Sequence, residues 1–175
     1  MKQPTIYPTI RQLALTFGLW VLLSAGFRFF AFNMFFYEAL LAFVKGYLEI
    51  LSGIFGVIYH EFPSSDNLIA LNGASLKIIY ECTAYSYYLF IFAIVLFSPW
   101  KWHQKLWGGA TLLILTTLLN ALRFFSVAWI IRKHPAHLDI FHDYVWNVLF
   151  AVIVFLMYFV MHYLFIRKNH KPSAV

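Results

Sequence analysis

Three polar segments interrupt this apolar chain, and each carries residue types that could take part in nucleophilic chemistry. The first contains Cys82, the single cysteine, where a polar stretch meets an apolar one. We expect a helix to begin here, and a thiol at a helix N-terminus feels the positive end of the dipole, which favours the reactive thiolate. Cysteine is equally common as a small buried residue, so a structural role stays open. One cysteine excludes an internal disulfide.

The second segment contains Asn120 and Arg123, which lie three residues apart and therefore share one face of a helix. Both lie within an otherwise apolar stretch. An ionisable residue inside a membrane helix is costly unless it is paired, so it is a candidate functional residue. Two structural roles remain open for Arg123. It could extend its charge to the membrane surface, or it could pair with a carboxylate such as Glu81 or Asp143.

The third segment contains His142 and Asp143, at the start of the last apolar stretch. Histidine changes its charge near neutral pH and can therefore carry protons in a reaction. A histidine at the membrane surface, without a chemical role, is the simpler alternative. Together the three segments could supply a nucleophile, a fixed positive charge and a proton carrier.

A different set of side chains overlaps the third segment and could bind a metal ion. Its members are His134, His137, Asp139, His142 and Asp143. Histidine and aspartate bind zinc, nickel or copper. Pro135 breaks a helix early in this stretch, and the spacing matches no familiar metal motif. We therefore expect no metal and no other cofactor, and a metal-dependent membrane enzyme is kept as an alternative.

The composition decides which solvent surrounds these segments. Apolar residues make up 62% of the 175 residues, charged residues make up 11%, and the mean hydropathy is +0.74. Soluble proteins carry about 25% charged residues, so lipid must surround much of this chain. The formal charge is +6. Basic residues in a membrane protein mark cytoplasmic loops and contact anionic lipids, so we expect membrane lipids as partners and no nucleic acid.

Apolar stretches of the chain approach the roughly 20 residues that a membrane-spanning helix needs. The predicted spans cover residues 13–32, 83–99, 106–131 and 144–166. Residues 34–59 are different, because polar side chains recur along one helical stripe. The stripe consists of Glu38, Lys45, Glu49, Ser52 and Gly56. It predicts an amphipathic helix that lies at the membrane surface, re-enters it or spans it.

Residues 60–81 form the longest polar stretch and predict a β-hairpin. The dipeptide Asn72-Gly73 favours a tight turn. Residues that favour strands flank the turn at Leu68–Leu71 and at Leu76–Tyr80. The hairpin would lead directly into the helix that begins near Cys82.

Basic residues indicate how the chain is oriented in the membrane. They gather at residues 101–105 and in the C-terminal tail, which places both segments in the cytoplasm and the hairpin on the extracytoplasmic side. The predicted fold is therefore all-α, a polytopic transmembrane helical bundle with a short extracytoplasmic β-hairpin before the Cys82 helix. We expect a single integral membrane domain over residues 1–175.

Taken in order, the three segments resemble the core motifs of the exosortase/archaeosortase family of membrane transpeptidases. The matching residues are Glu81-Cys82-Thr83-Ala84-Tyr85, then Asn120 and Arg123, and then His142 at the start of the last helix. The resemblance covers residues 60–165. Ala84 stands where the family often has glycine, which we expect to be a mild change, and the chain is short for the family.

The resemblance implies a cysteine transpeptidase or protease in the plasma (inner) membrane, with its active site on the extracytoplasmic side. Its partners would be exported proteins with C-terminal sorting signals, each a short motif, an apolar helix and a basic tail. The implied catalytic residues are Cys82 as nucleophile, His142 as proton carrier and Arg123 as the stabilising charge. The implied substrate-binding or supporting residues are Asn120, Glu81, Thr83, Tyr85 and Asp143. A non-enzymatic membrane assembly or transport module remains an alternative.

Overall fold

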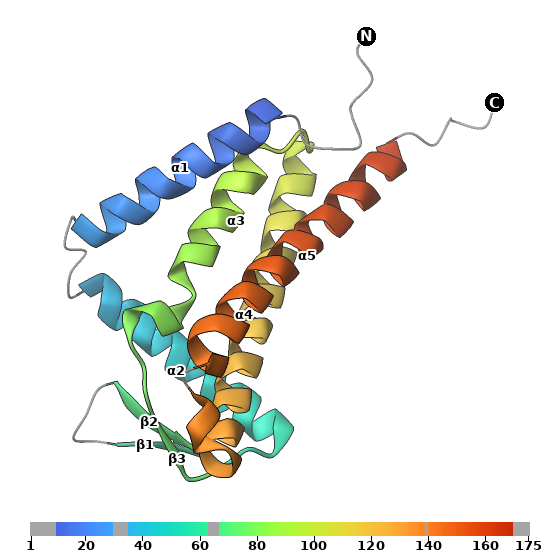
Figure 1. Cartoon of the computed structure of the whole chain (residues 1–175). Coiled ribbons are helices and arrows are strands. Elements are labelled where there is room, and N and C mark those ends of the chain that lie inside the picture. Colours follow the sequence, from blue (N-terminus) through green and yellow to red (C-terminus); the bar gives the residue numbers. More distant parts are fainter. Residues whose placement is uncertain (1–9, 30–34, 63–66, 139, 170–175) are drawn as a thin grey trace. The chain divides into compact units, whose positions relative to one another are not determined.

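The computed structural model describes residues 10–29, 35–62, 67–138 and 140–169, and most of them are helical (Figure 1). The helices in chain order are α1 (Ile10–Phe29), α2 (Phe35–Phe55), the 3-10 helix η1 (Tyr80–Thr83), α3 (Tyr85–Phe97), α4 (Trp102–Lys133), the 3-10 helix η2 (Pro135–His137), the π-helix η3 (Ile140–Val145) and α5 (Trp146–Asn169). The strands are β1 (Tyr59–Glu61), β2 (Leu68–Leu71) and β3 (Ala74–Lys77), which form one antiparallel sheet.

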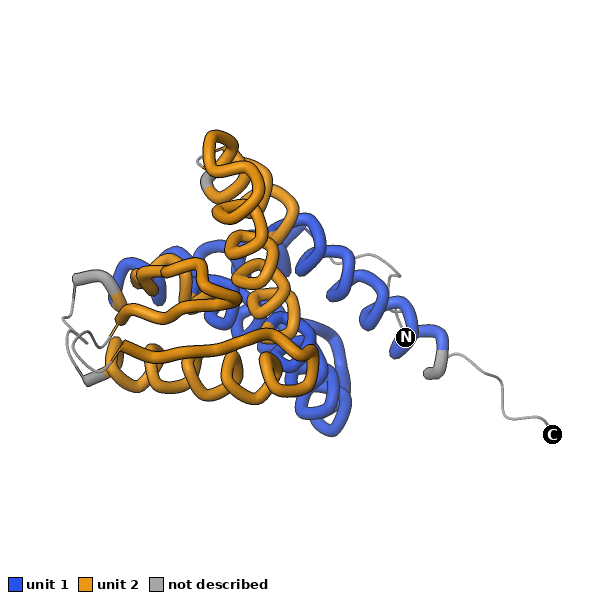
Figure 2. Tube along the Cα trace, turned by 90° about the horizontal axis from the view of Figure 1, so that it is seen from below, with its two compact units in different colours: residues 1–26, 86–116, 151–175 blue, residues 27–85, 117–150 orange. Residues whose placement is uncertain are grey.

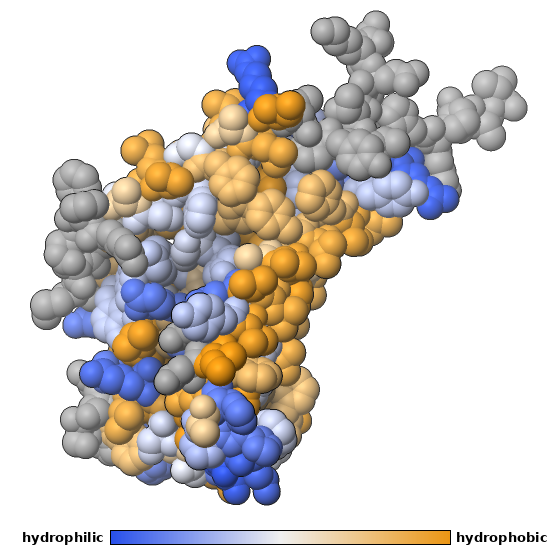
Figure 3. Space-filling view, viewed as in Figure 1, coloured by the Kyte–Doolittle hydropathy of each residue, from blue (hydrophilic) through white to orange (hydrophobic). Residues whose placement is uncertain are grey.

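Three helical segments among the described residues are long and apolar enough to cross a membrane. They are Ile10–Phe27, Trp102–Lys133 and Ile140–Arg167. Apolar side chains cover the visible length of α5 in Figure 3, and Val148, Leu156 and Val160 are exposed on that helix. Exposed apolar surface of this extent marks contact with a membrane or with another protein. The helices therefore fit the prediction of a membrane protein.

Helix α3 is shorter than the span predicted for residues 83–99. It has 13 residues and is therefore about 20 Å long, whereas the hydrocarbon core of a bilayer is about 30 Å thick. The helix starts late because Ala84 has a left-handed backbone, with φ of 57°. It ends where the Ser98 hydroxyl donates a 2.7 Å hydrogen bond to the Val95 carbonyl and Pro99 follows. The apolar composition was recognised, but these two breaks were not.

Helix α2 buries its apolar side rather than its polar stripe. Leu41, Val44 and Leu48 are buried, at the spacing of one helix face. Glu38 and Glu49 from the predicted stripe are exposed. Gly56 is exposed as well, but Lys45 is half-buried and Ser52 is buried. The stripe therefore faces outward only in part, and the helix lies against the rest of its unit through aliphatic contacts.

The chain divides into two compact units (Figure 2). Unit 1 contains residues 1–26, 86–116 and 151–175, and unit 2 contains residues 27–85 and 117–150. The sheet, η1, η3 and the second half of α4 all belong to unit 2, so the three candidate segments lie in one unit. The single integral membrane domain stays a prediction.

The predicted β-hairpin is confirmed, with a shifted second strand. Strands β2 and β3 pair through Leu71 and Ala74 next to the turn. Asn72 and Gly73 have φ values of 49° and 81°, as the tight turn between antiparallel strands requires. The second strand begins at Ala74, directly after this two-residue turn, and not at Leu76 as predicted. Strand β1 was not predicted, because three residues carry too little periodicity to be recognised.

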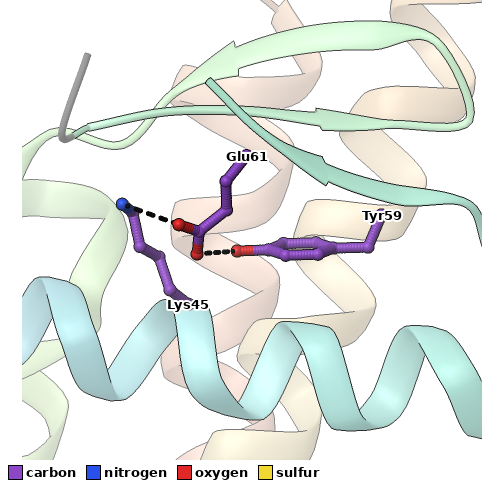
Figure 4. A network of polar contacts seen from close by, with 3 residues as sticks. All are labelled: Lys45, Tyr59 and Glu61. Atoms are coloured by element: carbon purple, nitrogen blue, oxygen red, sulfur yellow. Dashed lines mark hydrogen bonds and ion pairs between the residues drawn. The ribbon is translucent and has the colours of Figure 1, made fainter. Parts of the chain in front are cut away.

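A small polar network connects α2 to the outer strand β1 (Figure 4). The Lys45 ammonium lies 3.5 Å from Glu61 Oε2, and the Tyr59 hydroxyl donates a 2.7 Å hydrogen bond to Glu61 Oε1. The hydrogen bond from Tyr59 is the main reason that the pKa of Glu61 is lowered, and Lys45 adds to it. Exposed ion pairs contribute little to stability, so the network serves mainly to orient β1 against α2.

Candidate active site

Cys82 lies in the 3-10 helix η1, between the hairpin and α3. Its backbone N–H donates a 2.9 Å hydrogen bond to the Ile79 carbonyl, and only 7% of the residue is exposed. Ala84 separates η1 from α3, which starts at Tyr85. The cysteine is therefore not in the first turn of an α-helix, as the sequence suggested. Contacts with particular side chains, rather than a helix dipole, must set the reactivity of this thiol.

The three implied catalytic side chains meet in unit 2. Cys82 Sγ lies 3.9 Å from Nε2 of His142, and Arg123 Nη2 lies 3.4 Å from the same nitrogen. His142 belongs to the π-helix η3, just before α5. Such widened turns are rare and often occur at functional sites. Arg123 and Cys82 precede His142 by 19 and 60 residues, and both contact the same nitrogen of its ring.

These side chains open onto a cavity of about 270 Å³. The residues that line it are Ser75, Leu76, Lys77, Cys82, Arg123, Phe124, Val127, Ile131, Leu138 and His142. Two of them are cationic, and no carboxylate is among them. A cavity with a thiol, an imidazole and two positive charges is suited to a ligand that carries or develops negative charge.

Arg123 is buried without a carboxylate partner among the described side chains. Only 5% of the residue is exposed, so it does not extend to the membrane surface. Glu81, a predicted partner, is exposed, and the side chain of Asp143 lies outside the described residues. A buried charge is expensive unless something compensates it. The open position for that compensation is the cavity, next to Cys82.

Two features of the cluster favour a reactive thiolate. Burial of the Cys82 thiol raises its pKa, but hydrogen bonds with His142 and with the backbone at Ile79, together with the charge of Arg123, outweigh burial and lower the pKa. A guanidinium can only donate hydrogen bonds, so Nε2 of His142 accepts from Arg123. The neutral ring then carries its proton on Nδ1, which leaves Nε2 able to accept the proton of the thiol.

Asn120 holds the backbone of Cys82 in place. Its amide nitrogen donates hydrogen bonds to the Cys82 carbonyl, at 3.0 Å, and to the Tyr47 hydroxyl, at 2.7 Å. Asn120 is completely buried. The resemblance implied a substrate-binding or supporting role for Asn120, and these contacts support the backbone of the turn that carries Cys82.

Tyr47 was missed by the sequence analysis. It lies on the buried face of α2, three residues after Val44 and one residue before Leu48. A buried tyrosine hydroxyl nearly always has a hydrogen-bond partner. That requirement was the signal that could have linked α2 to the site.

The remaining supporting residues have different positions. The Thr83 hydroxyl donates a 2.7 Å hydrogen bond to the Tyr80 carbonyl and closes the η1 turn. The ring of Tyr85 packs on that of Tyr80, with centroids 4.1 Å apart. Glu81 is exposed. Thr83 and Tyr85 therefore shape the turn that carries the cysteine.

The alternative metal site does not assemble from the side chains that the structure describes, which contain no group of three potential ligands. The rings of His134 and His137 lie 6.3 Å apart, and His142 contacts Cys82 and Arg123 instead. Asp139 and the side chain of Asp143 lie outside the described residues.

Comparisons with protein-family models, with curated proteins and with solved structures find no match to this chain. The family resemblance therefore stays a prediction that depends on the motifs. The geometry of the site is what bears on function, and it brings Cys82 and Arg123 of those motifs into contact with His142.

Proposed function

We propose that this chain is a membrane-embedded cysteine transpeptidase or protease that cleaves C-terminal sorting signals of exported proteins. The observation that carries the proposal is the shared contact of Cys82 and Arg123 with Nε2 of His142, at the wall of a cavity. A structural cysteine needs neither a base nor a buried cation beside it. Both favour a nucleophilic cysteine, because the thiolate is the reactive form.

The first half of the reaction forms a thioester. His142 Nε2 takes the proton of the Cys82 thiol, and the thiolate attacks the scissile carbonyl carbon, whose electron pair moves to oxygen. When this tetrahedral intermediate collapses, the C–N bond breaks and Nε2–H gives its proton to the leaving amine. The signal helix and basic tail leave as an amine, and the exported protein stays on Cys82 as an acyl group.

The second half releases the exported protein. Water or an acceptor amine attacks the thioester carbon, and His142 Nε2 accepts its proton. The C–S bond then breaks, and Cys82 leaves as a thiolate that is reprotonated from Nε2. Water gives hydrolysis, and an amine gives transfer to an acceptor.

Arg123 is suited to stabilise the charge that develops between these steps. It is always protonated, so it is not the base. Once Nε2 carries a proton, it can no longer accept from Arg123, and the guanidinium N–H groups become available to the thiolate or to the oxyanion of the intermediate. Stabilisation of this kind is stronger at a buried site than in water.

The membrane setting belongs to the same proposal. Helices α1, α4 and α5 would form a polytopic bundle in the plasma membrane, with the site on the extracytoplasmic side. Its support is the apolar length of these helices and the basic residues of 101–105 and of the tail. A substrate with an apolar helix could then lie in the bilayer beside the site.

The test is processing of a tailed substrate in cells. The chain is co-expressed with an exported protein that ends in a short motif, an apolar helix and a basic tail. We expect Cys82→Ala to abolish processing while membrane insertion is retained, and His137→Ala, an exposed histidine outside the cluster, to process normally. Processing that continues in Cys82→Ala would contradict the proposal and would favour a non-enzymatic assembly or transport module.

A further inference from the structure

Strand β3 is the edge strand of the sheet on the side of the candidate site. The strand order is β1-β2-β3, so within the described residues β3 has a neighbour on one side only. Three of its residues, Ser75 to Lys77, line the same cavity as Cys82. The edge of a sheet therefore borders the proposed nucleophile.

The pairing pattern shows which backbone groups of β3 face away from β2. Antiparallel strands exchange hydrogen bonds at every second residue pair. The Ile78 N–H bonds to the Asn67 carbonyl at 2.7 Å, and this pair continues the register of β2 and β3. Ile78, Leu76 and Ala74 therefore direct their backbone groups toward β2. Ser75 and Lys77 direct theirs to the open side.

Alternate side chains of β3 point to the two faces of the sheet, and only one face is covered. Ala74 and Leu76 are buried, whereas Ser75 and Lys77 are exposed. The turn at Asn72-Gly73 holds this strand in register with β2, so the edge is already in the conformation that a further strand would need.

We propose that the open edge of β3 binds the segment of the substrate next to the scissile bond as an additional β-strand, paired to the backbone of Ser75 and Lys77. The inference rests on the proposed function for the substrate, an extended peptide. Strand addition recognises the peptide backbone and leaves sequence choice to side-chain pockets. A strand advances about 3.3 Å per residue. A few paired residues of the substrate would therefore be enough to hold the scissile carbonyl beside Cys82.

A series of peptidyl chloromethyl ketones tests this on the unmodified protein. Acetyl-tetra-alanine chloromethyl ketone alkylates cysteine, and each alanine in turn is replaced by N-methylalanine, which cannot donate a backbone hydrogen bond. The rate of Cys82 modification is followed by mass spectrometry of the protein in lipid nanodiscs. We expect N-methylation at alternate residues to slow the reaction about fivefold for each hydrogen bond lost, and methylation at the residues between to leave the rate unchanged. Equal rates across the series, or a uniform decrease, would contradict strand addition.

Substitutions on the protein side give a matched comparison. Ser75→Pro removes the outward N–H without removing a bond to β2, and proline is tolerated on edge strands. Ser75→Ala changes the side chain and keeps the N–H. Each peptidyl rate is divided by the same variant's rate with iodoacetamide, and we expect this ratio to be about fivefold lower in Ser75→Pro than in Ser75→Ala. Equal ratios in the two variants would contradict the inference, and the probe series decides the matter if Ser75→Pro does not fold.

This experiment separates the inference from the proposed function. An alternating pattern in the probe series, combined with normal processing by Cys82→Ala, would support the strand site and overturn the peptidase. Loss of processing in Cys82→Ala, combined with a flat series, would support the peptidase and overturn strand addition.

Discussion

Each unit holds a histidine that contacts a nitrogen donor; His142 in unit 2 is half-buried and His162 in unit 1 is buried, and their surroundings differ. In unit 2, His142 Nε2 contacts the Cys82 thiol and the Arg123 guanidinium at a cavity. In unit 1, His162 is 1% exposed, and its Nδ1 accepts a 3.2 Å hydrogen bond from the Trp100 indole. Both accept a hydrogen bond from a nitrogen donor, but only His142 has a thiol beside it.

The surroundings of His162 are closed by aromatic rings. The ring of Trp100 stacks on Tyr158, with centroids 5.5 Å apart, and meets Phe165 edge-on at 4.9 Å. A Cβ on Gly108 would lie 2.6 Å from the Trp100 ring, so the packing leaves no room there. This comparison teaches that the neighbours of a histidine, and not its burial alone, distinguish a candidate functional site from a structural contact.

The largest expected effect comes from removing the proton carrier. His142→Ala should lower the rate of processing by about 10²–10⁴, the usual contribution of general acid–base catalysis. His137→Ala, five residues away and exposed, is the control and should process at the normal rate. The measurement is the initial rate of substrate cleavage at equal amounts of inserted protein. Equal losses in both variants would contradict a special role for His142.

Arg123 distinguishes a catalytic charge from a structural one. Arg123→Gln removes the charge and keeps hydrogen-bonding groups, and it should lower the cleavage rate by about 10²–10³, as for other groups that stabilise an oxyanion. Arg132→Gln changes an exposed arginine at the end of the same helix and should have little effect. A thermal shift assay shows whether Arg123→Gln is still folded. A folded Arg123→Gln protein with full activity would remove Arg123 from the mechanism.

A substitution at His162 should change the stability of the protein and not the reactivity of Cys82. His162→Ala leaves the buried Trp100 N–H without its acceptor, which should lower stability by about 1–3 kcal/mol. Because His162 belongs to unit 1, where it contacts Trp100, and Cys82 belongs to unit 2, the rate of Cys82 alkylation in the folded protein should not change. Unfolding in a denaturing detergent series gives the stability, and labelling gives the rate. A much slower alkylation of Cys82 in folded His162→Ala would contradict the distinction between His142 and His162.

The pH dependence of Cys82 alkylation follows from the lowered pKa. Only the thiolate reacts with iodoacetamide, so the rate rises with pH and levels off above the pKa. In the native protein we expect the midpoint below the value of about 8.5 for a free thiol. Losing the His142 hydrogen bond or the Arg123 charge should move the midpoint upward, so His142→Ala and Arg123→Gln label more slowly near pH 7. A midpoint that stays the same in both variants would contradict the electrostatic explanation.

The smallest expected effect concerns the turn that carries the thiol. Ala84 is 2% exposed and has a left-handed backbone, with φ of 57°, which costs about 1–2 kcal/mol for a residue with a Cβ. Glycine has no such penalty. Ala84→Gly should therefore raise stability by about 1 kcal/mol and keep activity, and Ala84→Val should lower both. Unfolding midpoints measured side by side check this order.

The sequence predicted those features that depend on neighbouring residues. The hairpin followed from Asn72-Gly73, and the apolar helices followed from their composition. The ends of α3 were misjudged, because a left-handed alanine and a hydroxyl-capped end leave no mark in an apolar pattern. Ala84 itself was seen as a mild change from glycine, although its φ value places it where glycine would be favoured.

The candidate site was only partly visible for the same reason. Cys82, Arg123 and His142 were recognised through their unusual positions in apolar surroundings. Tyr47 and Lys77 were not, because their roles depend on how α2 and β3 pack around the nucleophile turn. Contacts between segments that are distant in the sequence depend on the tertiary structure, which a local sequence pattern does not specify.

The most direct test of the central claim is to trap the acyl-enzyme. The protein in nanodiscs is mixed with a tailed substrate, quenched in acid and examined by mass spectrometry. We predict an adduct of the substrate's N-terminal part on Cys82 that is released by hydroxylamine, as a thioester is, and that is absent in Cys82→Ala. Substrate cleavage without an adduct in the native protein, and at an equal rate in Cys82→Ala, would contradict the account.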